Sequence, residues 1–116
     1  MSLKFYNSYS RKKEFFKPII DGKVGLYTCG PTVYDFAHIG NFRTFIFEDL
    51  LKRWLVHSGY EVTHIMNITD VDDKTIKMAN DLNVDLNIIT EGYTEQFMND
   101  LRWLKILPAD NYPRAT

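Results

Sequence analysis

The chain has 116 residues, of which 45% are hydrophobic and 15% aromatic, so it is long enough to bury one core and too apolar to be disordered. Its formal net charge of -1 excludes the overall basic surface of a protein that binds nucleic acid mainly through charge. A single cysteine excludes an internal disulfide and predicts a reducing, cytoplasmic location. No apolar run has the length of a membrane span, and the N-terminus lacks the apolar core of a signal peptide, so no membrane partner is expected.

The first expected elements are a short strand at 3–6 and a basic, aromatic connection at 11–17. An Asp-Gly pair at 21–22 is typical of a turn. Residues 24–29 form a short, β-prone and mostly apolar run, which predicts a buried strand. This strand ends at the lone cysteine, Cys29, and a Gly-Pro turn follows it.

Helical spacing is clearest at 42–58, where apolar residues recur every three or four positions and charged residues occupy the other face. The apolar side expected to be buried comprises Phe42, Phe45, Ile46, Phe47, Leu50, Leu51, Trp54 and Leu55. Gly59 is placed to end this helix, and residues 61–68 predict a second strand. Strand, helix and strand in this order form a βαβ unit, which implies parallel pairing and a right-handed crossover.

Two further helices are expected. The first has Asp70, Asp72 or Asp73 as its cap, runs to Leu82, and places Ile76, Ala79 and Leu82 inward. The second has Thr90 as its cap and an apolar face of Tyr93, Phe97, Leu101 and Leu104. The tail at 107–116 contains two prolines and is expected to form no closing element. Because two parallel strands are few for a doubly wound sheet, we expect a fold that is cut short.

The segment His38-Ile39-Gly40-Asn41 stands where the first strand gives way to the long helix. Helix N-termini attract phosphate, and open α/β sheets bind ligands at the carboxyl ends of their strands. His38 would donate a hydrogen bond or carry charge there, Gly40 would let a base or ribose approach, and Asn41 would add an amide donor. A capped helix that merely begins with a histidine explains the same four residues.

Cys29 can be read as a buried small hydrophobe, as a nucleophile or as a metal ligand. Its possible partners, His38, His57 and His64, lie on different predicted elements without ligand spacing. Any zinc site built from this chain alone would therefore be incomplete.

The run at 67–74, Asn-Ile-Thr-Asp-Val-Asp-Asp-Lys, closes the second strand. Thr69 and the acids would face the same crevice as the helix start, although a strand end followed by a helix cap explains them equally. A calcium loop is excluded, because Thr75 stands where its tight-turn glycine belongs and Asp81 where a glutamate is required.

Together these segments make the chain resemble the N-terminal part of the cysteinyl-tRNA synthetases, a family of class I aminoacyl-tRNA synthetases. The matching segments are 26–35, 38–41, 43–45, 67–74 and 113–116. The resemblance implies an α/β fold: residues 1–116 would be the N-terminal portion of a Rossmann-like parallel-sheet nucleotide-binding domain, truncated and without a second domain. It also implies that ATP, with magnesium, activates cysteine as an adenylate, which is then transferred to tRNA-Cys.

The resemblance implies roles for individual residues. His38 would stabilise charge on the ATP phosphates, Gly40 would lie against the adenine, and Asn41 would help to hold the nucleotide. Asn41 stands where many class I enzymes have a second histidine, and an amide donates hydrogen bonds but carries no charge. Cys29 would be one of four zinc ligands, with Gly30 and Thr69 lining the cysteine pocket beside it.

The remaining zinc ligands, the family's second phosphate-binding loop and its anticodon-binding domain have no counterpart in these residues. The resemblance therefore implies a fragment that is inactive alone. Two alternatives stay open: an ATP-dependent ligase that joins cysteine to a small amino sugar, and a non-catalytic nucleotide-binding module.

Overall fold

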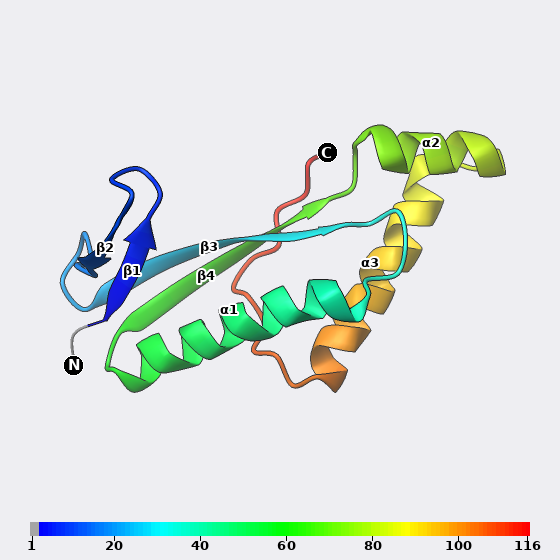
Figure 1. The fold of residues 1–116 in the computed structure, drawn as a ribbon. Coiled ribbons are helices and arrows are strands. Elements are labelled where there is room, and N and C mark those ends of the chain that lie inside the picture. Colours follow the sequence, from blue (N-terminus) through cyan, green and yellow to red (C-terminus); the bar gives the residue numbers. More distant parts are fainter. Residues whose placement is uncertain (1–2) are drawn as a thin grey trace.

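The computed structural model describes residues 3–116, which form an elongated molecule of 53 × 32 × 24 Å (Figure 1). In chain order its elements are β1 (Lys4–Asn7), β2 (Lys12–Phe15), β3 (Lys23–Thr32), α1 (Ile39–His57), β4 (Glu61–Thr69), α2 (Asp73–Leu82) and α3 (Leu86–Trp103). Within residues 3–116, no helix is both long and apolar enough to cross a bilayer.

The centre of the fold is the predicted βαβ unit. Strands β3 and β4 pair in parallel, with Val24 opposite Val62 and Cys29 opposite Asn67, and α1 connects them (Figure 1). The helix ends at His57 with Ser58 as its C-cap, and Gly59 follows with a φ of 91°, a conformation that glycine adopts without strain. The predictions of a parallel pair and of a glycine stop are both confirmed.

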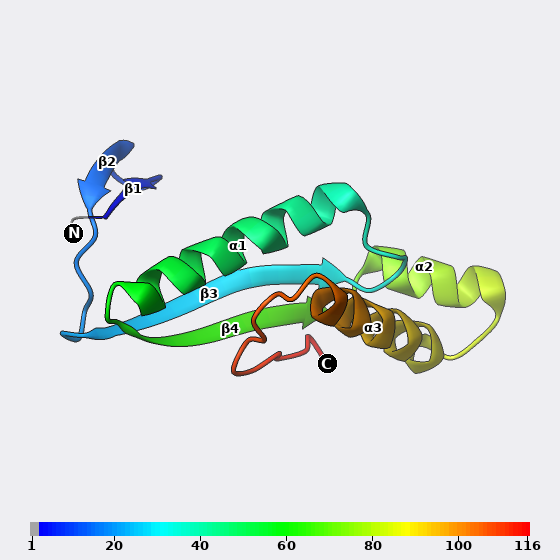
Figure 2. The ribbon, with the colours of Figure 1, turned by 90° about the horizontal axis from the view of Figure 1, so that it is seen from below.

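Helix α1 lies along the sheet and covers one of its faces (Figure 2). Phe42 and Phe45 on α1 join Met66 on β4 and Phe97 and Leu101 on α3 in one aromatic-rich core. The rings of Phe45 and Phe97 meet edge to face, with centroids 5.2 Å apart. Side chains of α1 and α3, which are far apart in the sequence, therefore pack in one core.

Only part of the predicted apolar side of α1 is buried. Phe47 and Leu50 are each 63% exposed, and they line an open groove against Leu3 and Phe5 rather than the core. The prediction was wrong for these residues because α1 is apolar on two sides, whereas the sheet covers one. Lys52 is buried instead, and its ammonium donates a 2.7 Å hydrogen bond to the carbonyl of Pro108.

The two later helices differ from prediction in their details. Asp72 caps α2, as one of the predicted candidates, but Ile76 and Leu82 are exposed and only Ala79 of the expected inward set is buried. Helix α3 begins at Leu86 rather than at Thr90, whose hydroxyl donates back to the Leu86 carbonyl inside the helix. A threonine that satisfies its hydroxyl in this way need not be a cap.

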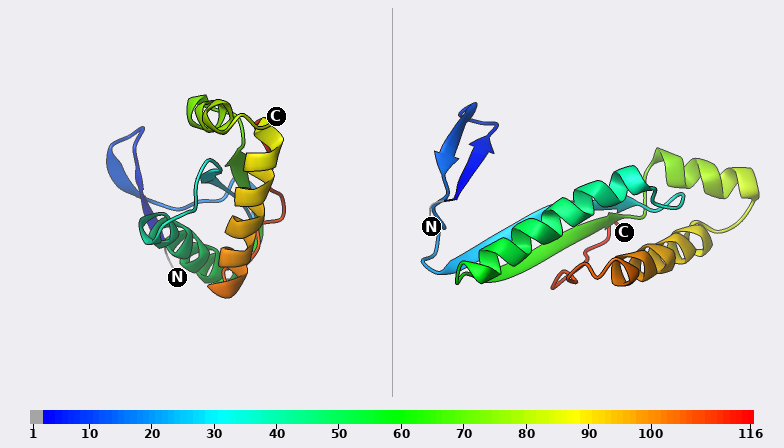
Figure 3. Two further views of the ribbon diagram at one scale, coloured as in Figure 1. Left: turned by 90° about the vertical axis from the view of Figure 1, so that its right-hand side faces the viewer. Right: turned by 60° about the horizontal axis from the view of Figure 1, so that its bottom comes forward.

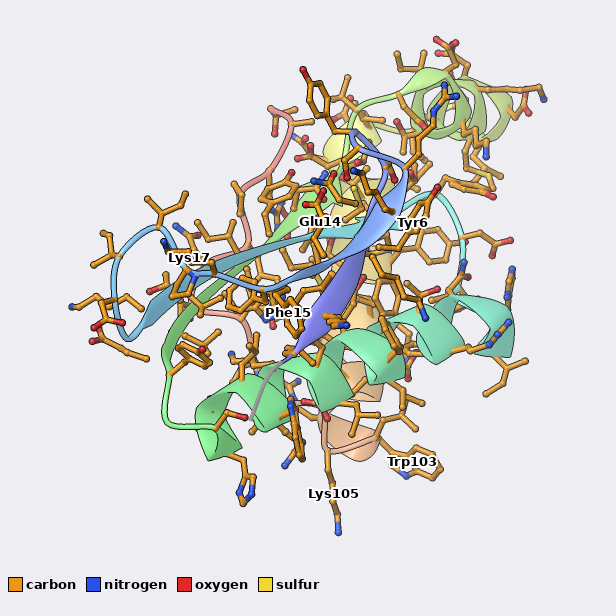
Figure 4. The ribbon with its side chains drawn as sticks, turned by 60° about the vertical axis from the view of Figure 1, so that its left-hand side comes forward. Tyr6, Glu14, Phe15, Lys17, Trp103 and Lys105 are labelled. Carbon is orange, nitrogen blue, oxygen red and sulfur yellow. The ribbon has the colours of Figure 1, made fainter. Side chains whose placement is uncertain are left out.

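Residues 12–15, expected to be part of a connection, form β2, which pairs with β1 in an antiparallel hairpin. The hairpin stands off one end of the sheet, while α2 lies at the other (Figure 3). Its base is fixed by edge-to-face contacts of Phe16 with Phe5 and Tyr60. Figure 4 shows Tyr6, Glu14 and Phe15 on this hairpin. Trp103 lies exposed at the far end of α3.

The tail also differs from prediction, because it pairs with β4. Bridges join Ile65 to Asn111 and Ile68 to Arg114, both in parallel, so the tail extends the sheet beyond β4. The amide of Ile68 donates to the carbonyl of Pro113 at 2.8 Å. Proline lacks an N–H, but its carbonyl still accepts a hydrogen bond, so a proline in this segment does not prevent pairing.

Candidate nucleotide-binding site

A polar cavity of about 320 Å³ lies at the carboxyl end of β3, where the chain turns into α1. It is lined by Gly30, Pro31, Thr32, Tyr34, Asp35, Phe36, Ala37, His38, Asn41, Phe45 and Lys74. Of the residues predicted to form the site, Gly30, His38 and Asn41 line this cavity, whereas Cys29, Gly40 and Thr69 lie beside it.

His38 and Asn41 cap α1 reciprocally. The imidazole Nδ1 of His38 accepts from the amide of Gly40 at 3.1 Å, and the side-chain oxygen of Asn41 accepts from the amide of His38 at 3.0 Å. The capped-helix interpretation is thus correct for the local geometry. Because Nδ1 accepts, a neutral ring carries its proton on Nε2, which leaves a donor for a ligand.

Gly40 makes this capping arrangement possible. A Cβ at position 40 would lie 2.9 Å from the His38 ring, so a side chain there would displace the imidazole. The role of Gly40 that the structure shows is therefore to leave room for the histidine.

Gly30 is the most constrained position at the end of β3. Its amide donates to the side-chain oxygen of Asn67 at 2.9 Å, and a Cβ would lie 1.9 Å from the Asn67 carbonyl oxygen. The register shifts just beyond it, so that Thr32 pairs with Thr69. Asn67 therefore positions the strand end that lines the cavity, a role that the sequence analysis missed.

Cys29 is a free, exposed thiol on the sheet face opposite the buried Thr28. It neighbours Gly30 but does not line the cavity. Residues 3–116 contain no cluster of three or more histidine, cysteine or acidic side chains that could hold a metal ion. A thiolate suits zinc, so Cys29 fits one ligand of a site whose other ligands would come from outside this segment.

Thr69 is half-buried at the end of β4, and its carbonyl accepts from the amide of Val33 at 3.1 Å. This hydrogen bond fixes the start of the loop between β3 and α1, which lines the cavity, to β4. The predicted contact of the Thr69 side chain with cysteine is not tested by these contacts.

His64 is a core histidine in this structure. Its Nε2 lies 2.9 Å from the Thr28 hydroxyl, and the side chain is buried. Burial lowers the pKa of His64 and nearby Lys52 lowers it further, while Asp110 and Asp49 oppose the shift. The imidazole is therefore neutral at pH 7 and belongs to the layer between the sheet and α1.

Asp70, directly after β4, joins the sheet to the tail. Its buried carboxylate accepts from the amides of Ala115 and Thr116 at 3.0 and 3.2 Å and from the Thr116 hydroxyl at 2.6 Å. Burial by itself raises the pKa of Asp70, but these hydrogen bonds outweigh it and hold the pKa below its usual value of 3.8.

We expect Asp70→Asn to lower the free energy of unfolding by about 1–3 kcal/mol at pH 7, because it removes charge-assisted hydrogen bonds. Since the folded-state pKa is depressed, the stabilisation is fully present above the unfolded-state pKa and is lost as the pH falls through the folded-state value. Urea denaturation of both proteins from pH 7 to pH 3 should show the difference shrink with acid. Asp21→Asn, in the exposed turn before β3, is the control and should change the free energy of unfolding little. If the difference between Asp70→Asn and wild type were the same at pH 3 as at pH 7, the ionised Asp70 carboxylate would not be the source of the stabilisation.

Comparisons with known proteins place these features in a family. Residues 15–116 match the family model described as tRNA synthetases class I (C) catalytic domain. The chain is 61% identical over 114 residues to a cysteine–tRNA ligase of Chlamydia pneumoniae, covering 98% of this chain. It is 49% identical over 116 residues to a cysteine–tRNA ligase of Thermococcus kodakarensis, covering 100% of this chain.

In both comparisons the chain spans 24% of the relative's length. The family match covers β3, α1 and β4 and includes the whole lining of the cavity. The chain therefore belongs to the class I tRNA synthetase family, in its cysteine-type catalytic domain, and corresponds to an N-terminal part of that domain.

Proposed function

We propose that the protein containing this segment is a cytoplasmic cysteine–tRNA ligase, which activates cysteine with ATP and magnesium and transfers the cysteinyl group to tRNA-Cys. The observation that supports this most is the polar cavity into which both His38 and Asn41 project from the start of α1. The relatives are named cysteine–tRNA ligases, which supports cysteine and tRNA as the substrates.

In this proposal the cavity holds the nucleotide. The Nε2–H of His38 donates to phosphate oxygens of ATP as charge develops there, while Nδ1 stays fixed by the Gly40 amide. The NH2 of Asn41 is a second donor, because its side-chain oxygen is already occupied by the cap. Gly40 then serves the nucleotide indirectly, by leaving space for the imidazole.

Cysteine would lie beside the nucleotide, near Cys29, Gly30 and Thr69. When bound, zinc would supply a soft site for the substrate thiolate and thereby disfavour serine, whose hydroxyl is hard. Cys29 would hold that zinc from the exposed face at the end of β3.

The function is tested with the full-length protein and with residues 1–116 alone. The full-length protein should exchange pyrophosphate into ATP when cysteine is present, should do so far less with serine, and should charge tRNA-Cys. The segment alone should do neither. Transfer of cysteine to an amino sugar instead of tRNA-Cys would favour the small-molecule ligase. Pyrophosphate exchange by the segment alone would contradict the expectation that the active site needs residues from outside this segment.

Zinc content tests the role of Cys29. The full-length protein is expected to hold about one zinc ion per chain, and Cys29→Ala to lose most of it and to bind cysteine more weakly. Elemental analysis after dialysis measures the zinc. His57→Ala is the matched control, because His57 is an exposed soft donor at the far end of α1. Full zinc content and cysteine affinity in Cys29→Ala would refute the ligand role.

A further inference from the structure

Lys74 reaches the candidate cavity from a different element than the predicted site residues. It lies in the first turn of α2, which begins at Asp73, and lines the cavity together with Tyr34, His38 and Asn41. Its ammonium lies 5.1 Å from the centroid of the Tyr34 ring. A cation held over an aromatic face keeps its N–H groups available for another partner.

The charge of Lys74 is not neutralised within residues 3–116, where no ion pair includes it. Two acids near it accept hydrogen bonds from other groups: the Asp72 carboxylate accepts from the Thr75 amide, and that of Asp35 accepts from the Phe36 amide. In contrast, Lys77, one turn further along α2, pairs with Asp81 at 2.7 Å.

The position of Lys74 is also unfavourable for the helix. The first turn of a helix carries the positive end of its dipole, which disfavours a cation there. Thus neither an acidic partner nor the helix accounts for a lysine at position 74. A negatively charged ligand in the cavity would account for it.

We propose that Lys74 binds a phosphate group of ATP in this cavity. The proposal rests on the proposed function, which places the nucleotide there. Lysine is a compact point charge that binds phosphate without the fixed geometry of arginine. Lys74 then contributes the full positive charge that Asn41, an amide, does not carry, and it does so from α2 rather than from the start of α1.

The test uses the full-length protein and measures the KM for ATP in cysteine-dependent pyrophosphate exchange. Lys74→Ala should raise it about tenfold, which corresponds to about 1.4 kcal/mol of lost binding. Lys74→Arg, which keeps the charge, should recover most of that loss. Lys77→Ala is the matched control, because the residue lies on the same helix and is paired with Asp81, and it should behave as wild type.

A KM for ATP within twofold of wild type in Lys74→Ala would overturn the proposal. A raised KM for tRNA-Cys with an unchanged KM for ATP would also overturn it, since the lysine would then contact tRNA phosphates.

Calorimetric titration with ATP separates this proposal from the proposed function. If the wild-type protein binds ATP but shows no exchange, the function fails, and weaker binding by Lys74→Ala still supports the phosphate contact. An unchanged melting temperature in Lys74→Ala excludes a merely structural effect through Tyr34.

Discussion

Replacing Gly30 by alanine is expected to lower the free energy of unfolding by about 3 kcal/mol, because the new methyl group has no space. Its carbon would lie 1.9 Å from the carbonyl oxygen of Asn67 and 3.0 Å from the Cγ of Met66. The carbonyl belongs to the backbone of β4, so a side-chain rotation cannot relieve the contact. The strands must separate locally, and the hydrogen bond between the Gly30 amide and the Asn67 side chain is then lost as well.

Gly25→Ala is the matched control, because it lies on the same strand and a Cβ there meets nothing within 4 Å. It should change the free energy of unfolding by less than about 0.5 kcal/mol. Urea denaturation compares the two variants with wild type. The rate of pyrophosphate exchange by the full-length protein should also fall in Gly30→Ala, because Gly30 lines the cavity and its displacement would distort that lining. Equal stability of the two variants would show that β4 adjusts at low cost.

The sequence was sufficient for the parallel βαβ unit, because its signals are local and consistent. Residues 24–29 and 61–68 are β-prone runs, apolar residues recur at helical spacing between them, and a glycine follows the helix. The sequence was not sufficient to predict which face of α1 is buried. Phe45 and Phe47 are equally apolar, and only the position of the sheet decides that the first is core and the second exposed.

The same reasoning explains why β2 and the tail were missed. The strand Lys12–Phe15 is fully exposed, so it carries no alternation of apolar and polar residues to reveal it. The tail pairs with β4 through backbone groups and through Asp70, which leaves no pattern in the tail itself. Hydrophobic periodicity reports burial. Strand β2 buries none of its side chains, and the tail packs Ala109 and Tyr112 against the core, which are too few to form a periodic pattern.

For the site, a general rule placed the cavity correctly: ligands bind where parallel strands end. It brought Gly30 and His38 together, as the structure does. It did not identify Lys74, because the contact with Tyr34 joins residues on different elements and no spacing encodes it. Nor did it reveal that Gly30 is held by Asn67, which depends on the exact register of the two strands.

His38→Ala in the full-length protein is expected to slow cysteine-dependent pyrophosphate exchange by about 100- to 1,000-fold, the usual effect of removing one preorganised donor. This substitution alone is ambiguous. The imidazole also caps α1 through the Gly40 amide, so its loss should destabilise the helix by about 1 kcal/mol. A slower reaction could then result from a frayed helix start rather than from a missing donor.

His38→Asn separates the two roles. Asparagine is among the best N-cap residues, so its side-chain oxygen can replace Nδ1 as acceptor and preserve the stability of α1. It cannot place an Nε2–H in the cavity, and exchange should therefore fall about as far as in the alanine variant. Thermal denaturation and exchange rates measured on both variants give the answer. If His38→Asn keeps both the wild-type stability and the wild-type rate, His38 is a helix cap and the proposed role in catalysis is wrong.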